Sequence, residues 1–487
     1  MAEPVALERI STGIPGLDTV LYGGLVPGRA YLVRGGPGAG KTMFGLHFLA
    51  AGAAGGEPCL YIAFSLPEAK LRANAATVGF DLRGVDILDL SPSSEQFREQ
   101  KSYEFFSAAE VERGPLTQRI IETVERLHPS RVVVDAVTQL RYLTPDALQF
   151  RREMLAFLQF MSEHGATVYY ISEIGAAIPD DDLQFMADGI ITLASNGRER
   201  SVTVTKFQGS DYQAGAQSFR ITNRGIEVFP TLEPQAAEAA VPEEQVSSGI
   251  PELDALLFGG LERGTATFIS GPSGAGKTTF GLTFARGAAE RGERFALFVF
   301  DESREALLRH AEGINIRARA MAERGILSVT AVPTRRYAAD EFAALIRQEV
   351  ETHDARIVMI DSFTGYQQAI MGEDLDSHFH LLLDYLEKSG VTIIVTTQVA
   401  TITGDFHITD ANISYLADNI VFIRYLEMNG QLRKAIGVLK KRLSDFETTL
   451  REFEVTKYGV HVGKPLTGLR GILRGEPEWV GPQQGES

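Results

Sequence analysis

The chain has 487 residues, more than one hydrophobic core usually serves, so its length favours two or three domains. Hydrophobic residues make up 44% and charged residues 23%, values of ordinary globular proteins that exclude a disordered or fibrous chain. The net charge of −16 repels nucleic-acid phosphates at long range and argues modestly against a nucleic-acid partner, although a local basic channel is compatible with it.

The N-terminal half alternates short β-rich runs with helical stretches. Continuous apolar strands separated by helices indicate a mostly parallel sheet that is covered on both faces. Ligands of such sheets bind at the carboxyl ends of the strands. A later alternating run at 200–207 indicates an antiparallel extension at the sheet edge. The expected parallel strands cover 30–35, 59–64, 85–90, 131–136 and 166–172.

A phosphate-binding loop follows the first strand. Residues 35–42 read GGPGAGKT, which satisfies G-x-x-x-x-G-K-[ST] between a strand and a helix. Glycines let backbone N–H groups and the helix N-terminus face the phosphates of ATP. Lys41 would reach the β- and γ-phosphates, and the Thr42 hydroxyl would coordinate Mg²⁺. We assign nucleotide binding here to Gly36, Gly38, Ala39, Gly40, Lys41, Thr42 and Met43.

A carboxylate for the magnesium ion stands at the end of a neighbouring apolar strand. The run RVVVDAVT places Asp135 there, where it would hold Mg²⁺ through water. Taken singly, an Asp in this place is about as often a helix cap or a turn residue. Its position relative to the phosphate loop favours the metal.

The second half of the chain repeats the first. ISTGIPGLD from Ile10 returns as VSSGIPELD from Val246. Lys41 and Lys277 are 236 residues apart, and the aspartates of the two blocks are separated by the same number of residues. That period is far too long for a solenoid and indicates duplication of a whole domain. The segment at 231–245 is rich in Pro, Ala and Glu and is predicted to be the linker.

The second copy carries the same parts. Strands are expected at 266–271, 295–300, 326–332, 356–361 and 391–397, with an edge extension at 433–440. Its loop at 271–278 reads GPSGAGKT, and two such matches in register argue against a chance Gly-rich turn. Thr278 and Asp361 take the magnesium roles. We assign nucleotide binding to Gly274, Ala275, Gly276, Lys277, Thr278 and Thr279.

These elements predict an α/β protein of two tandem RecA-like P-loop NTPase domains. Each has a mostly parallel sheet, helices on both faces and an antiparallel edge extension. The predicted boundaries are 1–230 for the N-terminal domain and 246–463 for the C-terminal domain, followed by a short flexible tail at 464–487.

The motifs resemble one family. STGIPGLD followed by GGL, a GPxGAGKT-type loop and duplication of the whole unit are similar to the KaiC family of bacterial clock ATPases, over nearly the full chain. The resemblance implies homohexameric rings in two tiers with Mg²⁺-ATP bound between subunits. It also implies slow hydrolysis in the N-terminal tier, Ser/Thr autophosphorylation in the C-terminal tier, and a KaiB-like or other signalling partner. The tail is short, so we do not expect regulation by a KaiA-like partner.

The family's pair of glutamates, which follows the second strand and activates the attacking group, separates the two copies. The C-terminal copy has Asp301 and Glu302 at these places, and we expect Asp301 to be the base, although it is one methylene shorter than the family residue. The N-terminal copy has Ser65 and Leu66, so a general-base contribution of about 10²–10⁴ in rate would be missing. The alternative is that a displaced carboxylate compensates.

The family's intersubunit Lys-x-Arg finger shows the same asymmetry. It offsets charge on the γ-phosphate of a neighbouring subunit. The C-terminal copy keeps both ends as Lys440 and Arg442, whereas the N-terminal copy keeps Lys206 and replaces the arginine by Gln208. We therefore expect the N-terminal site to bind ATP mainly for assembly.

The family's phosphoacceptor segment corresponds to HITDANISYLADNI at 407–420. Ser414 matches the serine acceptor, and Tyr415 stands where the best-known member has threonine. The resemblance implies phosphorylation at Ser414 and raises it for Tyr415, whose hydroxyl lies farther from the backbone. The alternative is that both residues only pack at a subunit interface.

Two other functions share this fold. A nucleic-acid motor or recombinase would have the same loops and aspartates, and fold alone does not separate it from a KaiC-type protein. A scaffold that uses ATP only to close its ring fits the N-terminal copy. The lone cysteine, Cys59, and the absence of an uninterrupted apolar stretch long enough to span a bilayer lead us to expect a cytoplasmic protein without membrane contact.

Overall fold

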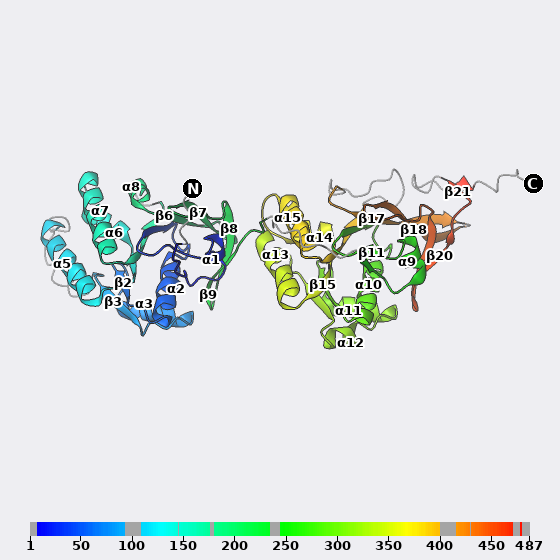
Figure 1. The fold of residues 1–487 in the computed structure, drawn as a ribbon, viewed down its shortest axis with the longest axis horizontal. Helices are drawn as coiled ribbons and strands as arrows, with labels where there is room; N and C mark the ends of the chain where they lie inside the picture. The colour runs from blue at the N-terminus through cyan, green and yellow to red at the C-terminus, as the bar shows by residue number, and fades with distance from the viewer. Residues whose placement is uncertain are drawn as a thin grey trace, which may run out of the picture. The chain divides into compact units, whose positions relative to one another are not determined.

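The computed structural model describes residues 7–92, 109–144, 146–175, 180–233, 244–399, 415–428, 430–470 and 478–479. The chain divides into two compact units, Met1–Thr231 and Leu232–Ser487 (Figure 1). Within the described ranges, no helix is both long and apolar enough to cross a membrane.

The N-terminal unit is built on a nine-stranded sheet with the order β3-β2-β4-β5-β1-β6-β7-β8-β9. Strands β1 to β6 pair in parallel, and β6 to β9 form an antiparallel extension. The strands are β1 (Ala30–Gly35), β2 (Cys59–Ala63), β3 (Val85–Asp89), β4 (Arg131–Asp135), β5 (Thr167–Glu173), β6 (Gly189–Ser195), β7 (Arg200–Phe207), β8 (Ala216–Thr222) and β9 (Gly225–Phe229).

Helices cover both faces of this sheet. Successive residues of β4 point to opposite sides, so Val133 joins the core beneath α2 while Val132 and Val134 join the core beneath α7. This two-sided burial explains the continuous apolar strands. The helices are α1 (Leu17–Val20), α2 (Lys41–Ala54), α3 (Glu68–Thr77), α5 (Ala109–Leu127), α6 (Val137–Leu143), α7 (Ala147–Glu163) and α8 (Asp181–Met186).

The C-terminal unit repeats this architecture in the order β14-β13-β15-β16-β12-β17-β18-β19-β20. Its main strands are β12 (Ala266–Gly271), β13 (Arg294–Val299), β14 (Leu327–Ala331), β15 (Ala355–Asp361), β16 (Thr392–Gln398), β17 (Asn419–Met428), β18 (Gln431–Lys441), β19 (Arg451–Thr456) and β20 (Gly459–Pro465). Two-residue strands pair as β10 (Gln245–Val246) with β11 (Leu261–Glu262), and β21 (Leu469–Arg470) with β22 (Glu478–Trp479).

Helices again lie on both faces of the second sheet. They are α9 (Pro251–Leu256), α10 (Lys277–Arg291), α11 (Arg304–Gly313), α12 (Ala318–Glu323), α13 (Ala339–Arg347) with a π-helical end (Gln348–Thr352), α14 (Phe363–Ala369) and α15 (Leu375–Lys388). The predicted fold, two RecA-like α/β domains with antiparallel edge extensions, is confirmed.

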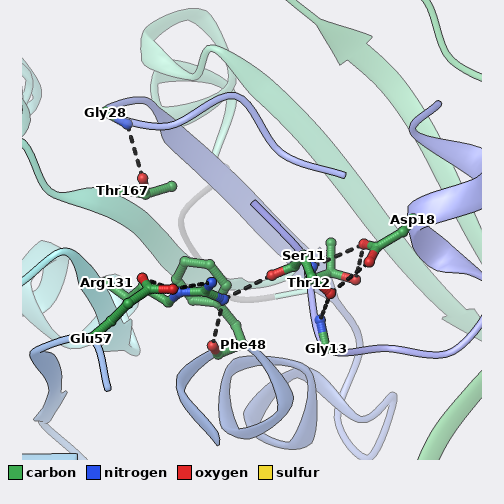
Figure 2. Close-up of polar contacts among 9 residues, drawn as sticks. All are labelled: Ser11, Thr12, Gly13, Asp18, Gly28, Phe48, Glu57, Arg131 and Thr167. Atoms are coloured by element: carbon green, nitrogen blue, oxygen red, sulfur yellow. Dashed lines mark hydrogen bonds and ion pairs between the residues drawn. The ribbon is translucent and has the colours of Figure 1, made fainter. Parts of the chain in front are cut away.

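The repeated STGIPGLD block is a structural motif that secures the chain before α1. Asp18 accepts hydrogen bonds from the Ser11 hydroxyl (2.6 Å) and from the backbone N–H and hydroxyl of Thr12 (2.9 and 2.6 Å; Figure 2). Gly13 has φ +72°, and a Cβ there would lie 2.5 Å from the His47 carbonyl oxygen, so this place requires glycine. In the C-terminal unit Asp254 accepts the equivalent bonds from Ser247 and Ser248.

A buried arginine ties this motif to the sheet of the N-terminal unit. Arg131, at the start of β4, donates to both carboxylate oxygens of Glu57 (2.8 and 2.7 Å) and to the carbonyls of Ser11 and Phe48 (2.8 and 3.0 Å; Figure 2). The guanidinium also lies 4.9 Å from the centroid of the Phe48 ring.

In the C-terminal unit an arginine also joins the equivalent block to an acidic residue, but this arginine comes from a different element. Ile357 takes the register position of the sheet arginine, and Arg291 at the end of α10 instead bonds the Ser247 carbonyl (2.9 Å) and Glu293 (2.9 Å). The acidic partner and the carbonyl keep their places while the arginine changes element.

Replacing the buried guanidinium should destabilise the N-terminal unit. The side chain of Arg131 is 4% exposed and that of Glu57 is 32% exposed, so Arg131→Met leaves a partly buried carboxylate and two carbonyls without their donor. The expected loss is about 2–3 kcal/mol in the free energy of unfolding. Hydrogen-exchange mass spectrometry in a urea series should show N-terminal peptides unfolding at lower urea. Arg83→Met, in an exposed ion pair, is the control and should leave the midpoint unchanged. Equal midpoints for both variants would contradict this assignment.

Candidate nucleotide-binding sites

Each unit forms a phosphate loop between its central strand and the helix that follows. β1 ends at Gly35 and α2 begins at Lys41, and β12 ends at Gly271 and α10 begins at Lys277. The last glycine before each helix has a left-handed backbone, with φ +103° at Gly40 and +107° at Gly276. Such φ values favour glycine, which explains the spacing of the motif. The helix N-termini and loop amides then form an anion site.

The loop lysines curl back over their own loops. Lys41 donates to the carbonyls of Gly35 and Gly36 (2.9 Å each), and Lys277 donates to the carbonyls of Gly271 and Pro272 (2.8 Å each). Burial lowers the pKa of Lys277 to about 8, although the Asp361 carboxylate opposes this effect. Exchanging carbonyl partners for phosphate oxygens would therefore favour the charged lysine.

The oxygen ligands expected for Mg²⁺ lie side by side in both units. The Thr42 hydroxyl donates to Asp135 Oδ2 (2.7 Å), and the Thr278 hydroxyl donates to Asp361 Oδ2 (2.7 Å). Mg²⁺ prefers hard oxygen ligands, keeps several waters and uses one or two carboxylates together with substrate phosphates. A hydroxyl and a carboxylate beside a phosphate loop fit this ion.

A third polar side chain orients each aspartate, and it comes from different strands in the two units. In the N-terminal unit the Tyr61 hydroxyl, on β2, donates to Asp135 Oδ2 (2.5 Å). Burial and the Asp135 carboxylate raise the pKa of Tyr61 far above its usual range, so it remains a donor. In the C-terminal unit the hydroxyl of Thr396, on β16, donates to Asp361 Oδ1.

The predicted acidic pair lies in a cavity of about 290 Å³ in the C-terminal unit. Glu302 is half-buried, and burial followed by the charges of Asp361 and Asp301 raises its pKa. The cavity is lined by Ser273, Gly274, Gly276, Lys277, Thr278, Thr279, Asp301, Glu302, His310, Asp361, Ser362, Gln398, Lys434 and Val455. The phosphate loop, the magnesium carboxylate and the acidic pair are therefore brought to one place.

The N-terminal unit has no such pair at these positions. The N–H of Phe64 donates to the Asp135 carbonyl, and that of Phe300 donates to the Asp361 carbonyl, so the residues after β2 and β13 are in register. Ser65 and Leu66 thus occupy the places of the C-terminal carboxylates.

Five cavity residues outside the phosphate loop were not predicted from the sequence, namely His310, Ser362, Gln398, Lys434 and Val455. His310 Nε2 lies 3.1 Å from the Thr279 hydroxyl, and Lys434 donates to the Gly274 carbonyl (3.0 Å) from the antiparallel edge. Gln398 ends β16 beside the loop. Gln398 and Ser362 had a signal in the sequence, because each directly follows an expected parallel strand whose carboxyl end faces ligands.

Comparison with known proteins decides the family. A family model described as "ATPase: KaiC" matches residues 10–233 and 246–467. The chain belongs to the KaiC ATPase family. It is similar to the circadian clock protein KaiC3 of Synechocystis sp. (strain ATCC 27184 / PCC 6803 / Kazusa), with 29% identity over 99% of this chain and 97% of the relative. It is also similar to the circadian clock oscillator proteins KaiC of Acaryochloris marina and Synechococcus elongatus, each 26% identical over 98% of this chain and over 92% and 93% of the relative.

The residues predicted to form the finger lie at the amino end of the parallel strands, whereas the phosphate loop of the same unit lies at the carboxyl end. Lys441 pairs with Asn419, which pairs with Thr267 near the start of β12, four residues or about 13 Å before Gly271. Arg442 is mostly exposed and bonds Asp418 (3.1 Å).

The N-terminal finger segment has the same place in its sheet. Lys206 pairs with Ile190 and Phe207 pairs with Gly189 at the start of β6, and Gln208 is exposed. Phe207 stacks on Tyr31, with ring centroids 5.6 Å apart, so the middle residue of the segment belongs to the core.

The segment of this KaiC-family chain that is predicted to hold the phosphoacceptor is described only from Tyr415 onward. Ser414 lies outside the described residues. Tyr415 is 62% exposed, and its ring meets the ring of His380 edge-on at 6.1 Å between centroids.

The acidic surroundings of the C-terminal finger should make stability depend on pH. Burial, then Asp418 and Asp384, raise the pKa of Glu387 to about 7 against the opposing charges of Arg442 and Lys388. A glutamate in an unfolded chain ionises near 4.5, so the stabilisation from protonated Glu387 is complete below pH 4.5 and is lost as the pH rises through 7.

Urea unfolding of wild type and Glu387→Gln at pH 5, 6, 7 and 8 measures this effect. Between pH 5 and 8 the wild type should lose about 1–2 kcal/mol relative to the variant, a value reduced for the partial exposure of the carboxyl. Glu323→Gln, at the exposed end of α12, should follow the wild type at every pH. The interpretation fails if Glu387→Gln keeps the wild-type pH slope.

Proposed function

We propose that this chain is an ATP-hydrolysing KaiC-type switch that assembles as a homohexamer, binds Mg²⁺-ATP in both units and turns over ATP chiefly in the C-terminal unit. The observation that carries the proposal is the C-terminal cavity, where Lys277, the Asp361 carboxylate and the acidic pair converge. The N-terminal unit has the same loop and magnesium residues but Ser65 and Leu66 after β2.

The position of the finger supports assembly. Because the finger lies at the amino end of the central strands, it does not serve the phosphate loop of its own unit, whereas in a ring it can serve a neighbour. A nucleotide shared in this way binds the assembly more tightly than the monomer and so favours the assembly by mass action. Lys440 and Arg442 would offset charge on the γ-phosphate in the C-terminal tier, and Lys206 alone would do so in the N-terminal tier.

The chemistry in the C-terminal unit follows from its side chains. Loop amides and Lys277 hold the phosphates, Thr278 and Asp361 hold Mg²⁺, and the ion supplies charge neutralisation when bound. Both members of the acidic pair line the cavity, and we propose Asp301 as the one that accepts the proton of the attacking group.

The same machinery is proposed to phosphorylate Ser414 in the C-terminal tier. The residue stands in the acceptor segment of a chain that belongs to the KaiC family, and the acidic pair and Arg442 are available for transfer. The relatives named as circadian clock proteins lead us to propose a cytoplasmic signalling or clock-type role with a KaiB-like partner.

Substitution of each loop lysine in turn tests whether the N-terminal site serves assembly and the C-terminal site serves ATP turnover. Lys41→Ala should weaken Mg²⁺-ATP-dependent assembly, measured by light scattering after size-exclusion chromatography, because the N-terminal nucleotide is proposed to join subunits. Lys277→Ala should remove most ATP turnover in assembled protein, because it loses the loop lysine of the site with the acidic pair. The control is each variant assayed in the other measurement. If Lys41→Ala abolishes ATPase activity in intact hexamers, the assignment of the tiers is wrong.

Phosphopeptide mapping after incubation with Mg²⁺-ATP tests the autokinase. Wild type should carry phosphate on Ser414, Ser414→Ala should carry none there, and Asp301→Asn should lose the modification by about 10²-fold or more because its proton acceptor is gone. Tyr415→Phe is the matched control, since it alters the adjacent hydroxyl and should keep Ser414 phosphorylation. Absence of phosphate on Ser414 in wild-type hexamers would reduce the protein to an ATPase switch.

A further inference from the structure

The N-terminal unit carries a carboxylate at a strand end that neither the family comparison nor the proposed function uses. Glu173 is the last residue of β5, and β5 lies between β4, which ends at Asp135, and β1, which ends at Gly35. Glu173 is in register with Gly35, and the N–H of the next residue, Ile174, donates to the Gly35 carbonyl (3.0 Å). Its position is thus fixed between the magnesium carboxylate and the phosphate loop.

A second hydrogen bond holds the backbone of this residue. The N–H of Glu173 donates to the hydroxyl of Thr138, which is buried at the start of α6 (3.2 Å). The Glu173 residue itself is exposed, so water can reach the carboxylate. A fixed backbone with a hydrated carboxylate suits a group that must meet a water molecule.

The duplicated unit shows that this strand end belongs to the nucleotide site. The register partner of Gly271 on β16 is Gln398, which lines the C-terminal cavity together with Lys277 and Asp361. Glu173 is therefore the counterpart of a residue that faces the nucleotide position.

The two units carry their acidic and neutral residues at opposite strand ends. The C-terminal unit has Asp301 and Glu302 after β13 and the amide of Gln398 at the end of β16. The N-terminal unit has neutral residues after β2 and Glu173 at the end of β5. Each site thereby keeps at least one carboxylate besides its magnesium aspartate.

We propose that Glu173 is the catalytic base of the N-terminal site, which hydrolyses ATP slowly. A water oxygen forms a bond to the γ-phosphorus while the bond from that phosphorus to the β,γ-bridging oxygen breaks, and the bond's electron pair leaves with ADP. The proton of the water passes to the Glu173 carboxylate and from there to solvent. This inference goes beyond the proposed function, which assigns the larger part of turnover to the C-terminal site.

The experiment uses full-length Lys277→Ala, in which the remaining turnover comes from the N-terminal site. Adding Glu173→Gln, which copies the amide of Gln398, should lower that turnover by about 10²-fold, since general-base catalysis contributes about 10²–10⁴. Affinity for Mg²⁺-ADP should stay within a few fold of the parent. The matched control is Glu68→Gln in the same parent, because Glu68 is the carboxylate nearest in sequence to Ser65 and Leu66; its turnover should not change.

Four results would overturn the proposal. They are unchanged turnover in Glu173→Gln, lost nucleotide affinity in that variant, loss of turnover in Glu68→Gln instead, and a parent no more active than the Lys41→Ala/Lys277→Ala double variant. The proposal that the C-terminal site performs most of the ATP turnover is tested separately, by comparing the turnover of Lys277→Ala with that of wild type. Failure of that assignment therefore leaves the Glu173 comparison intact.

Discussion

Both nucleotide sites depend on one hydrogen bond that joins the first turn of the helix after the phosphate loop to the end of a parallel strand. The threonine after each loop lysine donates to the aspartate at the end of β4 or β15, with 2.7 Å in both units. One strand, β5 or β16, lies between the strand that ends at this aspartate and the strand that leads into the phosphate loop, so the ends of these two strands are about 10 Å apart. This geometry sets a hydroxyl and a carboxylate beside the phosphate loop, and it gives the intervening strand end, at Glu173 or Gln398, a place inside the site.

The two units make equivalent contacts, but in some of these contacts the side chain comes from a different element. The aspartate that secures the STGIPGLD block accepts equivalent bonds in both units, whereas the arginine that ties this block to an acidic partner comes from β4 in one and from α10 in the other. The second hydroxyl that donates to the aspartate at the end of β4 or β15 likewise comes from Tyr61 in one unit and from Thr396 in the other. A contact can change its source because the fold fixes the place where the donor is needed, and several neighbouring elements reach that place.

The parts of the molecule that could be predicted are those whose signal is local in the sequence. Apolar runs and the offset of 236 residues gave the strands and the two domains, and the GPxGAGKT pattern located both loops. His310 and Lys434 could not be found in this way, because their roles arise from strand pairing and helix packing across more than thirty residues. The family resemblance predicts the acidic pair after the second strand, whereas the sheet order places the end of the fifth strand directly beside the strand that leads into the loop.

The antiparallel extension has a consequence that reaches beyond one unit. Because β17 and β18 run in opposite directions, the chain that passes the phosphate loop at Lys434 returns to the far edge of the sheet before it reaches Lys440 and Arg442. The reversal of chain direction that places Lys434 beside the phosphate loop therefore places Lys440 and Arg442 far from that loop. This fold therefore places Lys434 beside the nucleotide position of its own unit and Arg442 on the surface. There Arg442 lies among carboxyl groups, Asp418 and half-buried Glu387. Arg442 can act on a phosphate only if a neighbour brings the nucleotide to that surface and offers more negative charge than Asp418 does. In the proposed hexamer, assembly and catalysis would thus be linked through competition between an internal carboxylate and an external phosphate for the Arg442 guanidinium group.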